Sequence, residues 1–235
     1  MSCAVILESR LKEWGASFVG FCTLGNNGIP WAESLINAVS VGIHLSETVV
    51  DGIADKPTFT YFHHYRTVNT LIDQICLRGL LFIQENGYDA VAVPASQTVK
   101  DRTDNYSGIF PHKTAAVMSG LGWIGKSGLF ISNKYGPRVR LGTILTNMPV
   151  PAADIKDKSI FEELSSSGCG DCRLCIENCP AMALTGAKWT LNSRRNDILD
   201  ARACSEYMNS HFKHIGRGSV CGICMKVCPK GMTSR

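Results

Sequence analysis

The sequence has no uninterrupted run of about 18 apolar residues, the minimum for a membrane-spanning helix, which argues against a membrane span. It also lacks a basic segment ahead of an apolar stretch at its start, because the apolar residues after Met1 lead directly into Glu8 and Arg10. The sequence therefore predicts a helix there rather than a signal peptide, and a cytoplasmic protein. A net charge of only +4 is weak support for a nucleic-acid partner, since such proteins usually carry a denser basic surface.

Cysteine, in contrast, is abundant, with 11 residues in a chain of 235. Cys3, Cys22 and Cys76 lie far apart in apolar stretches and are predicted to be buried as small hydrophobic residues. The other eight fall between Cys169 and Cys228. Without an export signal, such clustering indicates metal binding rather than disulfide bonds.

Residues 1–150 predict a mixed α and β domain. Its clearest element is a helix from Thr58 to Glu85, where apolar residues recur at spacings of three and four and Asn86-Gly87 supplies a left-handed stop. Shorter helices are predicted at 9–14 and 112–118, and strands at 17–21, 38–43, 90–93, 128–132 and 139–145. A proline-containing polar linker then separates a first domain, 1–152, from a second, 160–235.

The cysteines of the second domain follow two related patterns. The first, from Cys169 to Cys179-Pro180, has the spacing C-x2-C-x2-C-x3-C-P of bacterial ferredoxins, in which three thiolates bind one cubane and the fourth binds the other. The second, from Cys221 to Cys228-Pro229, is one cysteine short, and Cys204 completes the count. The crossed arrangement gives the first 4Fe–4S cluster Cys169, Cys172, Cys175 and Cys228, and the second Cys179, Cys204, Cys221 and Cys224.

Two zinc sites are the alternative interpretation of these cysteines, since C-x2-C also suits tetrahedral zinc. Zinc requires neither the full four-cysteine run nor the repeated Cys-Pro ending. The sequence therefore favours two 4Fe–4S clusters. Two complete clusters indicate electron relay to a centre in the other domain.

A glycine-rich segment, Gly120-Leu121-Gly122-Trp123-Ile124-Gly125-Lys126-Ser127, fits both the P-loop and the Rossmann patterns. Its context argues against a nucleotide site, because those loops follow a strand and open a helix. Here a helix is predicted before the segment, at 112–118, and a strand after it, at 128–132. The alternative is a tight helix-to-strand turn, whose glycines also let the polar tail of a large ligand approach the backbone.

This glycine segment, the strands that follow it through Arg140-Leu141-Gly142, and the eight cysteines together resemble epoxyqueuosine reductases. They are more distantly similar to the catalytic part of reductive dehalogenases. The resemblance covers roughly residues 110–230. It implies an α+β fold, with a nitroreductase-like α/β core that binds cobalamin and a C-terminal bacterial ferredoxin-like module with two clusters. It also implies that a low-potential donor such as ferredoxin or flavodoxin supplies electrons, which the clusters pass to the corrinoid.

The resemblance also assigns site residues by matching positions. The corrinoid site would be lined by Gly120, Gly122, Trp123, Gly125, Lys126, Ser127, Arg140 and Tyr65. The queuosine enzymes carry an aspartate as proton donor about fourteen residues before the glycine segment, where this sequence has Tyr106, with Asp104 two positions away. Since dehalogenases are similar in using a tyrosine, Tyr106 is the candidate catalytic donor, and a half-buried loop tyrosine is the alternative.

Three functions follow as hypotheses. The first is a cobalamin-dependent oxidoreductase, and the second is a non-catalytic protein that binds or reduces corrinoid for another enzyme. The third is a ferredoxin-like module without corrinoid, whose other domain binds flavin or a partner. The queuosine enzymes continue into a helical-repeat tail that helps to hold tRNA, whereas this sequence ends seven residues after Cys228, so tRNA is a doubtful partner.

Overall fold

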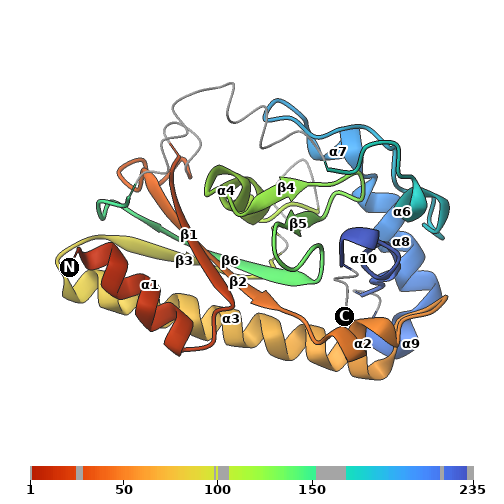
Figure 1. Ribbon diagram of the computed structural model, residues 1–235, viewed down its shortest axis with the longest axis horizontal. Helices are drawn as coiled ribbons and strands as arrows, with labels where there is room; N and C mark the ends of the chain where they lie inside the picture. Colours follow the sequence, from red (N-terminus) through yellow and green to blue (C-terminus); the bar gives the residue numbers. More distant parts are fainter. Residues whose placement is uncertain are drawn as a thin grey trace. The chain divides into compact units, whose positions relative to one another are not determined.

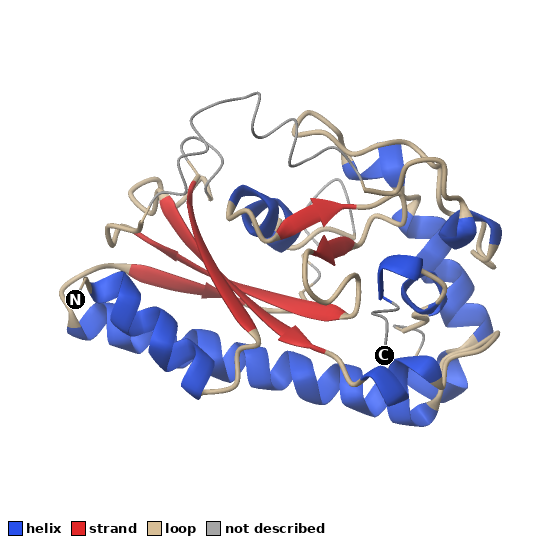
Figure 2. Cartoon of the chain, viewed as in Figure 1, coloured by secondary structure: helices blue, strands red, loops and turns tan. Residues whose placement is uncertain are grey.

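The computed structural model describes residues 2–24, 29–97, 99, 106–151, 168–217 and 220–231 (Figures 1 and 2). Two compact units are present: the first comprises residues 1–43, 68–121 and 140–161, and the second 44–67, 122–139 and 162–235. The second unit thus combines residues 44–67 and 122–139 with the cysteine-rich region of the chain. The division into functional domains at 1–152 and 160–235 stays a prediction.

The first unit contains a four-stranded sheet in the order β1-β2-β6-β3. The strands are β1 Phe18–Thr23, β2 Asn37–His44, β3 Ala90–Val93 and β6 Val139–Thr146. Strand β1 pairs antiparallel with β2, and β3 pairs antiparallel with β6, with Val91 opposite Leu145. Every residue of β2 from Asn37 to Ile43 is buried, as expected for a strand covered on both faces.

Two helices, α1 Cys3–Glu13 and α3 Phe59–Glu85, pack on one face of this sheet (Figure 1). Gly79 allows the close approach, because a Cβ atom there would lie 2.5 Å from Ile144 of β6 and 3.1 Å from Leu11 of α1. Helix α3 runs unbroken through Gly79 and ends where the sequence predicted, with Gly87 in a left-handed conformation at φ 83°.

The opposite face of the sheet is covered by α4, His112–Met118. The thiol of Cys22 in β1 lies 3.6 Å from the carbonyl oxygen of Ala115 in α4, and a Cβ atom on Gly20 would lie 2.9 Å from Leu121. The sheet is therefore enclosed by helices on both sides, which confirms the predicted mixed α and β fold. Cys22 and Cys76 are buried as predicted, whereas Cys3 is only half-buried because it occupies the first turn of α1.

The second unit consists of short helices and one hairpin. The hairpin pairs β4 Gly122–Ile124 with β5 Phe130–Ser132 in antiparallel register. The helical segments are α2 Glu47–Asp51, α6 Leu174–Glu177, α7 Arg195–Ile198, α8 Ala201–His211, α9 Lys213–Gly216, α10 Ile223–Lys226 and the 3-10 turn η2 Pro229–Gly231. Strand β4 was not predicted, since a glycine-initiated strand of three residues offers no alternation of apolar and polar positions.

A buried arginine connects the early and late segments of the second unit. Arg138 is 1% exposed, and its guanidinium binds the carboxylates of Glu47 and Asp51 in α2, the latter at 2.9 Å. Lys226 of α10 donates to the same Asp51 carboxylate at 3.1 Å. Both hydrogen bonds lower the pKa of Asp51, and the one from Arg138 has the larger effect. Arg138 also abuts the turn after Cys228, because a Cβ atom on Gly231 would lie 3.0 Å from its Nε.

No helix in the described ranges is both long enough and apolar enough to span a membrane. The longest of the described helices, α3, keeps charged residues such as Arg66, Asp73 and Arg78 along its length.

The environment of His112 predicts how the stability of the protein depends on pH. Its Nε2 lies 2.9 Å from the carbonyl oxygen of Pro94 and its Nδ1 2.8 Å from the hydroxyl of Thr143. Because a carbonyl only accepts, Nε2 carries the proton and Nδ1 accepts from Thr143. Burial is the largest cause that lowers the pKa of His112 to about 4, so the folded protein holds it neutral.

We expect stability to fall as the pH decreases from about 6.5 towards 4, because the unfolded chain then binds a proton that the folded chain does not. This group should cost about 2 kcal/mol between pH 7.5 and pH 5. The His112→Gln variant should lose that dependence, measured as the urea unfolding midpoint at both pH values. His63→Gln, at an exposed position on α3, is the control and should keep it. An unchanged pH dependence in His112→Gln would contradict the assignment.

Replacing Arg138 by Met should lower the free energy of unfolding by about 2 kcal/mol, since two partly exposed carboxylates lose their buried partner. Urea unfolding measures the change. Arg202→Met breaks an exposed ion pair to Glu206 and should cost less than about 1 kcal/mol. Equal costs in the two variants would show that the Arg138 network is not structural.

Candidate iron–sulfur site

Two short turns of the second unit carry most of the cysteines and repeat each other. Cys172 and Cys221 are 49 positions apart, and a helix begins two residues after each of them, α6 and α10. The amide of Cys179 donates to the Ile176 carbonyl at 3.2 Å, and at the same offset the amide of Cys228 donates to the Met225 carbonyl at 3.4 Å. Each Cys-Pro pair thus follows one helical turn in the same geometry.

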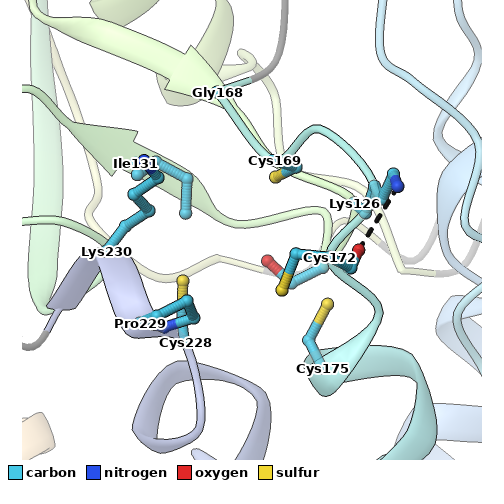
Figure 3. Close-up of a pocket in the computed structure, with 10 residues that line it drawn as sticks. Lys126, Ile131, Gly168, Cys169, Cys172, Cys175, Cys228, Pro229 and Lys230 are labelled. Atoms are coloured by element: carbon cyan, nitrogen blue, oxygen red, sulfur yellow. Dashed lines mark hydrogen bonds between the residues drawn. The ribbon is translucent and has the colours of Figure 1, made fainter.

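Four cysteines from both turns surround one cavity (Figure 3). The cavity has a volume of about 230 Å³ and is lined by Cys169, Cys172, Cys175 and Cys228, together with Lys126, Ser127, Ile131, Gly168, Pro229 and Lys230. Three of these thiols come from the first cysteine run and one from the second. This is the set that the crossed arrangement predicts for the first cluster.

The remaining cysteines form a second group. The thiols of Cys204 and Cys179 interact electrostatically, and Cys221 interacts with both of them. Cys224 interacts with these three and also with Cys175 of the first group. The two groups of four are therefore neighbours within the second unit.

Burial and the neighbouring cysteines disfavour the thiolate form of these side chains. Burial, followed by the charges of Cys169, Cys228 and Cys172, raises the pKa of Cys175 to about 11. Burial also raises the pKa of Cys221 to about 11, and burial likewise raises the pKa of Cys224. Thiols so placed are protonated at neutral pH unless a metal centre supplies positive charge, and binding of iron then releases the protons.

The size of the cavity distinguishes a cluster from a single zinc ion. Zinc holds four thiolates at about 2.3 Å from one point, which leaves no space between them. Here the sulfur atoms of Cys169, Cys172, Cys175 and Cys228 border a cavity of about 230 Å³. The donor set and the space it encloses therefore favour a 4Fe–4S cubane.

The glycine-rich segment forms the hairpin β4–β5 rather than a nucleotide-binding loop. Gly120 and Gly122 adopt φ values of 70° and 157°, and a Cβ atom on Gly122 would lie 2.0 Å from the carbonyl oxygen of Ile131. The chain continues into strand β5 instead of a helix, so no helix N-terminus is presented to a phosphate. The predicted order of helix, turn and strand is correct, with β4 inserted before the turn.

Lys126 contacts the cysteine loop. Its side chain is 8% exposed, and its ammonium donates to the carbonyl oxygens of Gly170 at 2.7 Å and Cys172 at 3.3 Å. Ser127, also buried, lines the cavity beside it. These contacts could not be predicted from the sequence, because the resemblance assigned both residues to the corrinoid and no local pattern links position 126 to position 170.

Trp123 of β4 has a buried polar atom without a described hydrogen-bond partner. The ring packs against Gly168, where a Cβ atom would lie 2.9 Å from it, and the indole Nε1 is buried without a hydrogen-bond partner among the described residues. A buried indole N–H normally finds an acceptor. This orphaned donor fits a polar ligand beside the glycine segment.

The other predicted site residues are distributed over both units. Gly120, Arg140 and Tyr106 belong to the first unit, and Arg140 donates from Nε to the Asn69 amide oxygen at 2.8 Å. Tyr65 belongs to the second unit. Both tyrosines are half-buried, and Asp104 lies outside the described residues. The corrinoid and proton-donor roles of these residues stay predictions.

Comparison with known proteins supports the presence of two 4Fe–4S clusters. Residues 168–231 match the 4Fe–4S double cluster binding domain family. The chain is 33% identical over 118 residues to the tetrachloroethene reductive dehalogenase of Sulfurospirillum multivorans, covering 48% of this chain and 22% of that protein. It is 33% identical over 127 residues to the epoxyqueuosine reductase of Pseudomonas aeruginosa, covering 50% of this chain and 30% of that protein. The chain therefore spans less than a third of the length of these relatives.

Solved structures show the same fold over nearly the whole chain. A reductive dehalogenase described as B12-dependent superposes with a TM-score of 0.69 at 21% identity, covering 97% of this chain and 32% of that one. The epoxyqueuosine reductase of Streptococcus thermophilus gives 0.64 at 20% identity, covering 97% and 66%. An epoxyqueuosine reductase solved with a modified tRNA stem loop gives 0.60 at 16%, covering 97% and 64%.

The predicted resemblance is thereby confirmed in both sequence and fold. The matched double-cluster region contains all eight clustered cysteines, the four around the cavity and the four beside them. The chain carries a 4Fe–4S double cluster binding domain and is related to the epoxyqueuosine reductases and reductive dehalogenases.

Proposed function

We propose that this chain is an iron–sulfur oxidoreductase in which two 4Fe–4S clusters pass low-potential electrons to a bound cobalamin. The observation that carries the proposal is the division of eight cysteines into two neighbouring groups of four, one of them around a cavity of about 230 Å³. The curated relatives are named reductases, which supports the reaction class.

The proposed ligands are the crossed sets, with one cluster held by Cys169, Cys172, Cys175 and Cys228 and the other by Cys179, Cys204, Cys221 and Cys224. All four thiols of each set are needed to complete a cubane, so neither cluster retains an open iron for substrate. Burial and then the charges of other cysteines, Cys175 of the other set among them, raise the pKa of Cys224, so the two sets lie near each other. The substrate is then reduced elsewhere in the protein.

The proposed cobalamin site includes the glycine segment, with Gly120, Gly122, Trp123 and Gly125 beside the ligand, and Arg140 and Tyr65 as further contacts. When bound, cobalamin supplies a redox-active cobalt able to accept an electron at low potential. The orphaned indole N–H of Trp123 supports a polar ligand at this segment. Tyr106 would hold the proton that its phenolic oxygen delivers to the reduced substrate.

The proposed electron donor is a small low-potential protein such as ferredoxin or flavodoxin. Exposed basic residues follow helix α8, which carries Cys204, and include Lys213, His214 and Arg217. Positive charge near a cluster attracts an acidic donor over several ångströms. A tRNA substrate remains a candidate, because one structural relative was solved with a tRNA stem loop.

A second candidate function is a non-catalytic protein that binds or reduces corrinoid for another enzyme. One observation favours it: the position where the queuosine enzymes carry their aspartate proton donor is occupied by Tyr106. A complete cluster module would serve electron transfer without turnover of its own.

The cluster assignment predicts about eight irons per chain after anaerobic reconstitution. Replacing Cys204 by Ser should lower the count to about four, because the second cubane loses a ligand while the first keeps all of its own. Iron analysis and the visible absorption spectrum measure this. Cys3→Ser, outside both groups, should retain the full count. Full iron in Cys204→Ser, or zinc in place of iron, would contradict the assignment.

The two proposed functions differ in the effect that they predict for replacing Tyr106. In an oxidoreductase, Tyr106→Phe should lower turnover at least about 100-fold through loss of the proton donor, with cobalamin binding unchanged. An epoxyqueuosine-modified tRNA stem loop serves as the substrate probe, and titration of cobalamin absorbance measures binding. Tyr88→Phe is the matched control and should turn over normally. Unchanged turnover in Tyr106→Phe would remove this tyrosine from the mechanism.

A further inference from the structure

The turn between β4 and β5 forms one wall of the cavity that the cysteines share. The amide of Gly128 donates to the Gly125 carbonyl at 2.8 Å, and the amide of Gly125 donates to the Leu129 carbonyl at 2.9 Å. These bonds define a closed turn, and the two residues between the glycines, Lys126 and Ser127, both line the cavity. Gly125 itself comes close to a thiol, since a Cβ atom there would lie 3.3 Å from the sulfur of Cys169.

Lys126 extends from this turn to the loop that carries the first cysteines. Figure 3 shows its ammonium directed to the carbonyl oxygen of Cys172, at the edge of the cavity rather than at its centre. The shorter bond, at 2.7 Å, is to the carbonyl oxygen of Gly170, which precedes Cys172 by two residues. With 8% of its surface exposed, Lys126 gives up hydration for these two contacts, and burying an ammonium is costly unless hydrogen bonds replace its water.

The charge of this ammonium is the distinctive property of the site. Lys226 forms an ion pair with Asp51, and Lys230, which also lines the cavity, is exposed to water. Within the described ranges, Lys126 makes no ion pair with a carboxylate, so two carbonyl dipoles are the described partners of its positive charge. Water screens a buried charge much less than an exposed one.

A buried cation affects a neighbouring cluster through its charge. One-electron reduction adds one negative charge to a 4Fe–4S cluster, and net charge, hydrogen bonds and solvent exposure are the factors that set its potential. A positive charge within several ångströms in a medium of low dielectric constant stabilises the reduced form more than the oxidised form. Its removal therefore makes the cluster harder to reduce.

We propose that Lys126 is a positioning residue for the cluster of Cys169, Cys172, Cys175 and Cys228: its ammonium holds the ligand loop by the Gly170 and Cys172 carbonyls and raises the reduction potential of that cluster. The segment that imitates a P-loop in sequence thus serves an iron–sulfur cluster instead of a phosphate. The inference rests on the cluster ligands of the proposed function and is independent of cobalamin and of the substrate.

The test is a redox titration of the anaerobically reconstituted full-length protein, followed by electron paramagnetic resonance. In Lys126→Met, one of the two reduction steps should shift to a more negative potential while the other stays in place. Lys126→Arg keeps the charge and should titrate like the wild type. Lys134→Met makes the same substitution at an exposed position just after β5 and should also leave both steps unchanged.

Each outcome decides the proposal. Two wild-type potentials in a fully loaded Lys126→Met protein would overturn it. Loss of about half the iron in Lys126→Met, with recovery in Lys126→Arg, would support the positioning role, because charge and reach are then what the loop requires. Loss of the same cluster in both variants would overturn it. A wild-type protein without iron would instead refute the proposed function, so the two failures are distinguishable.

Discussion

The cavity bordered by Cys169, Cys172, Cys175 and Cys228 is the constraint on which the second unit depends. Three of these thiols lie in one turn and the fourth lies far along the chain, after α8, α9 and α10. A cubane bound there would join the two turns by metal–ligand bonds, and the free energy of metal binding would contribute to folding. In the second group, Cys179 of the first turn would bind the cluster of the second turn. Each turn would therefore supply one thiol to the cluster of the other.

The sequence was sufficient to predict most elements of the first unit. Helix α4 was placed at its observed bounds from a short apolar pattern, and α3 was predicted within one residue because Asn86-Gly87 marks its end. Strand β3 was also correct, since Ala90–Val93 is an uninterrupted apolar run. Strand β4 was not predicted because it has only three residues and begins with glycine, which leaves no alternation of apolar and polar positions.

The site shows a similar limit. Cysteine spacing is a local pattern with a strict chemical requirement, and the four thiols that it assigns to the first cluster all line the cavity. The contacts of Lys126 join residues more than forty positions apart, and no spacing rule records such a contact. The same holds for Arg138, which has the appearance of an ordinary basic residue at the start of a strand and proves to be among the most deeply buried side chains.

The composition of the second unit also bears on the independence of its cysteine-rich part. Gly222, next to Cys221, adopts a left-handed conformation, and a Cβ atom there would lie 2.7 Å from Ile53 and 2.8 Å from Tyr61. Both partners come from the first third of the sequence, as do the carboxylates that bind Arg138. A fragment beginning at residue 160 would therefore expose the apolar side of the second cysteine turn to water. The cysteine-rich segment resembles a free-standing ferredoxin in its spacing, yet in this protein it packs against residues from the first third of the chain.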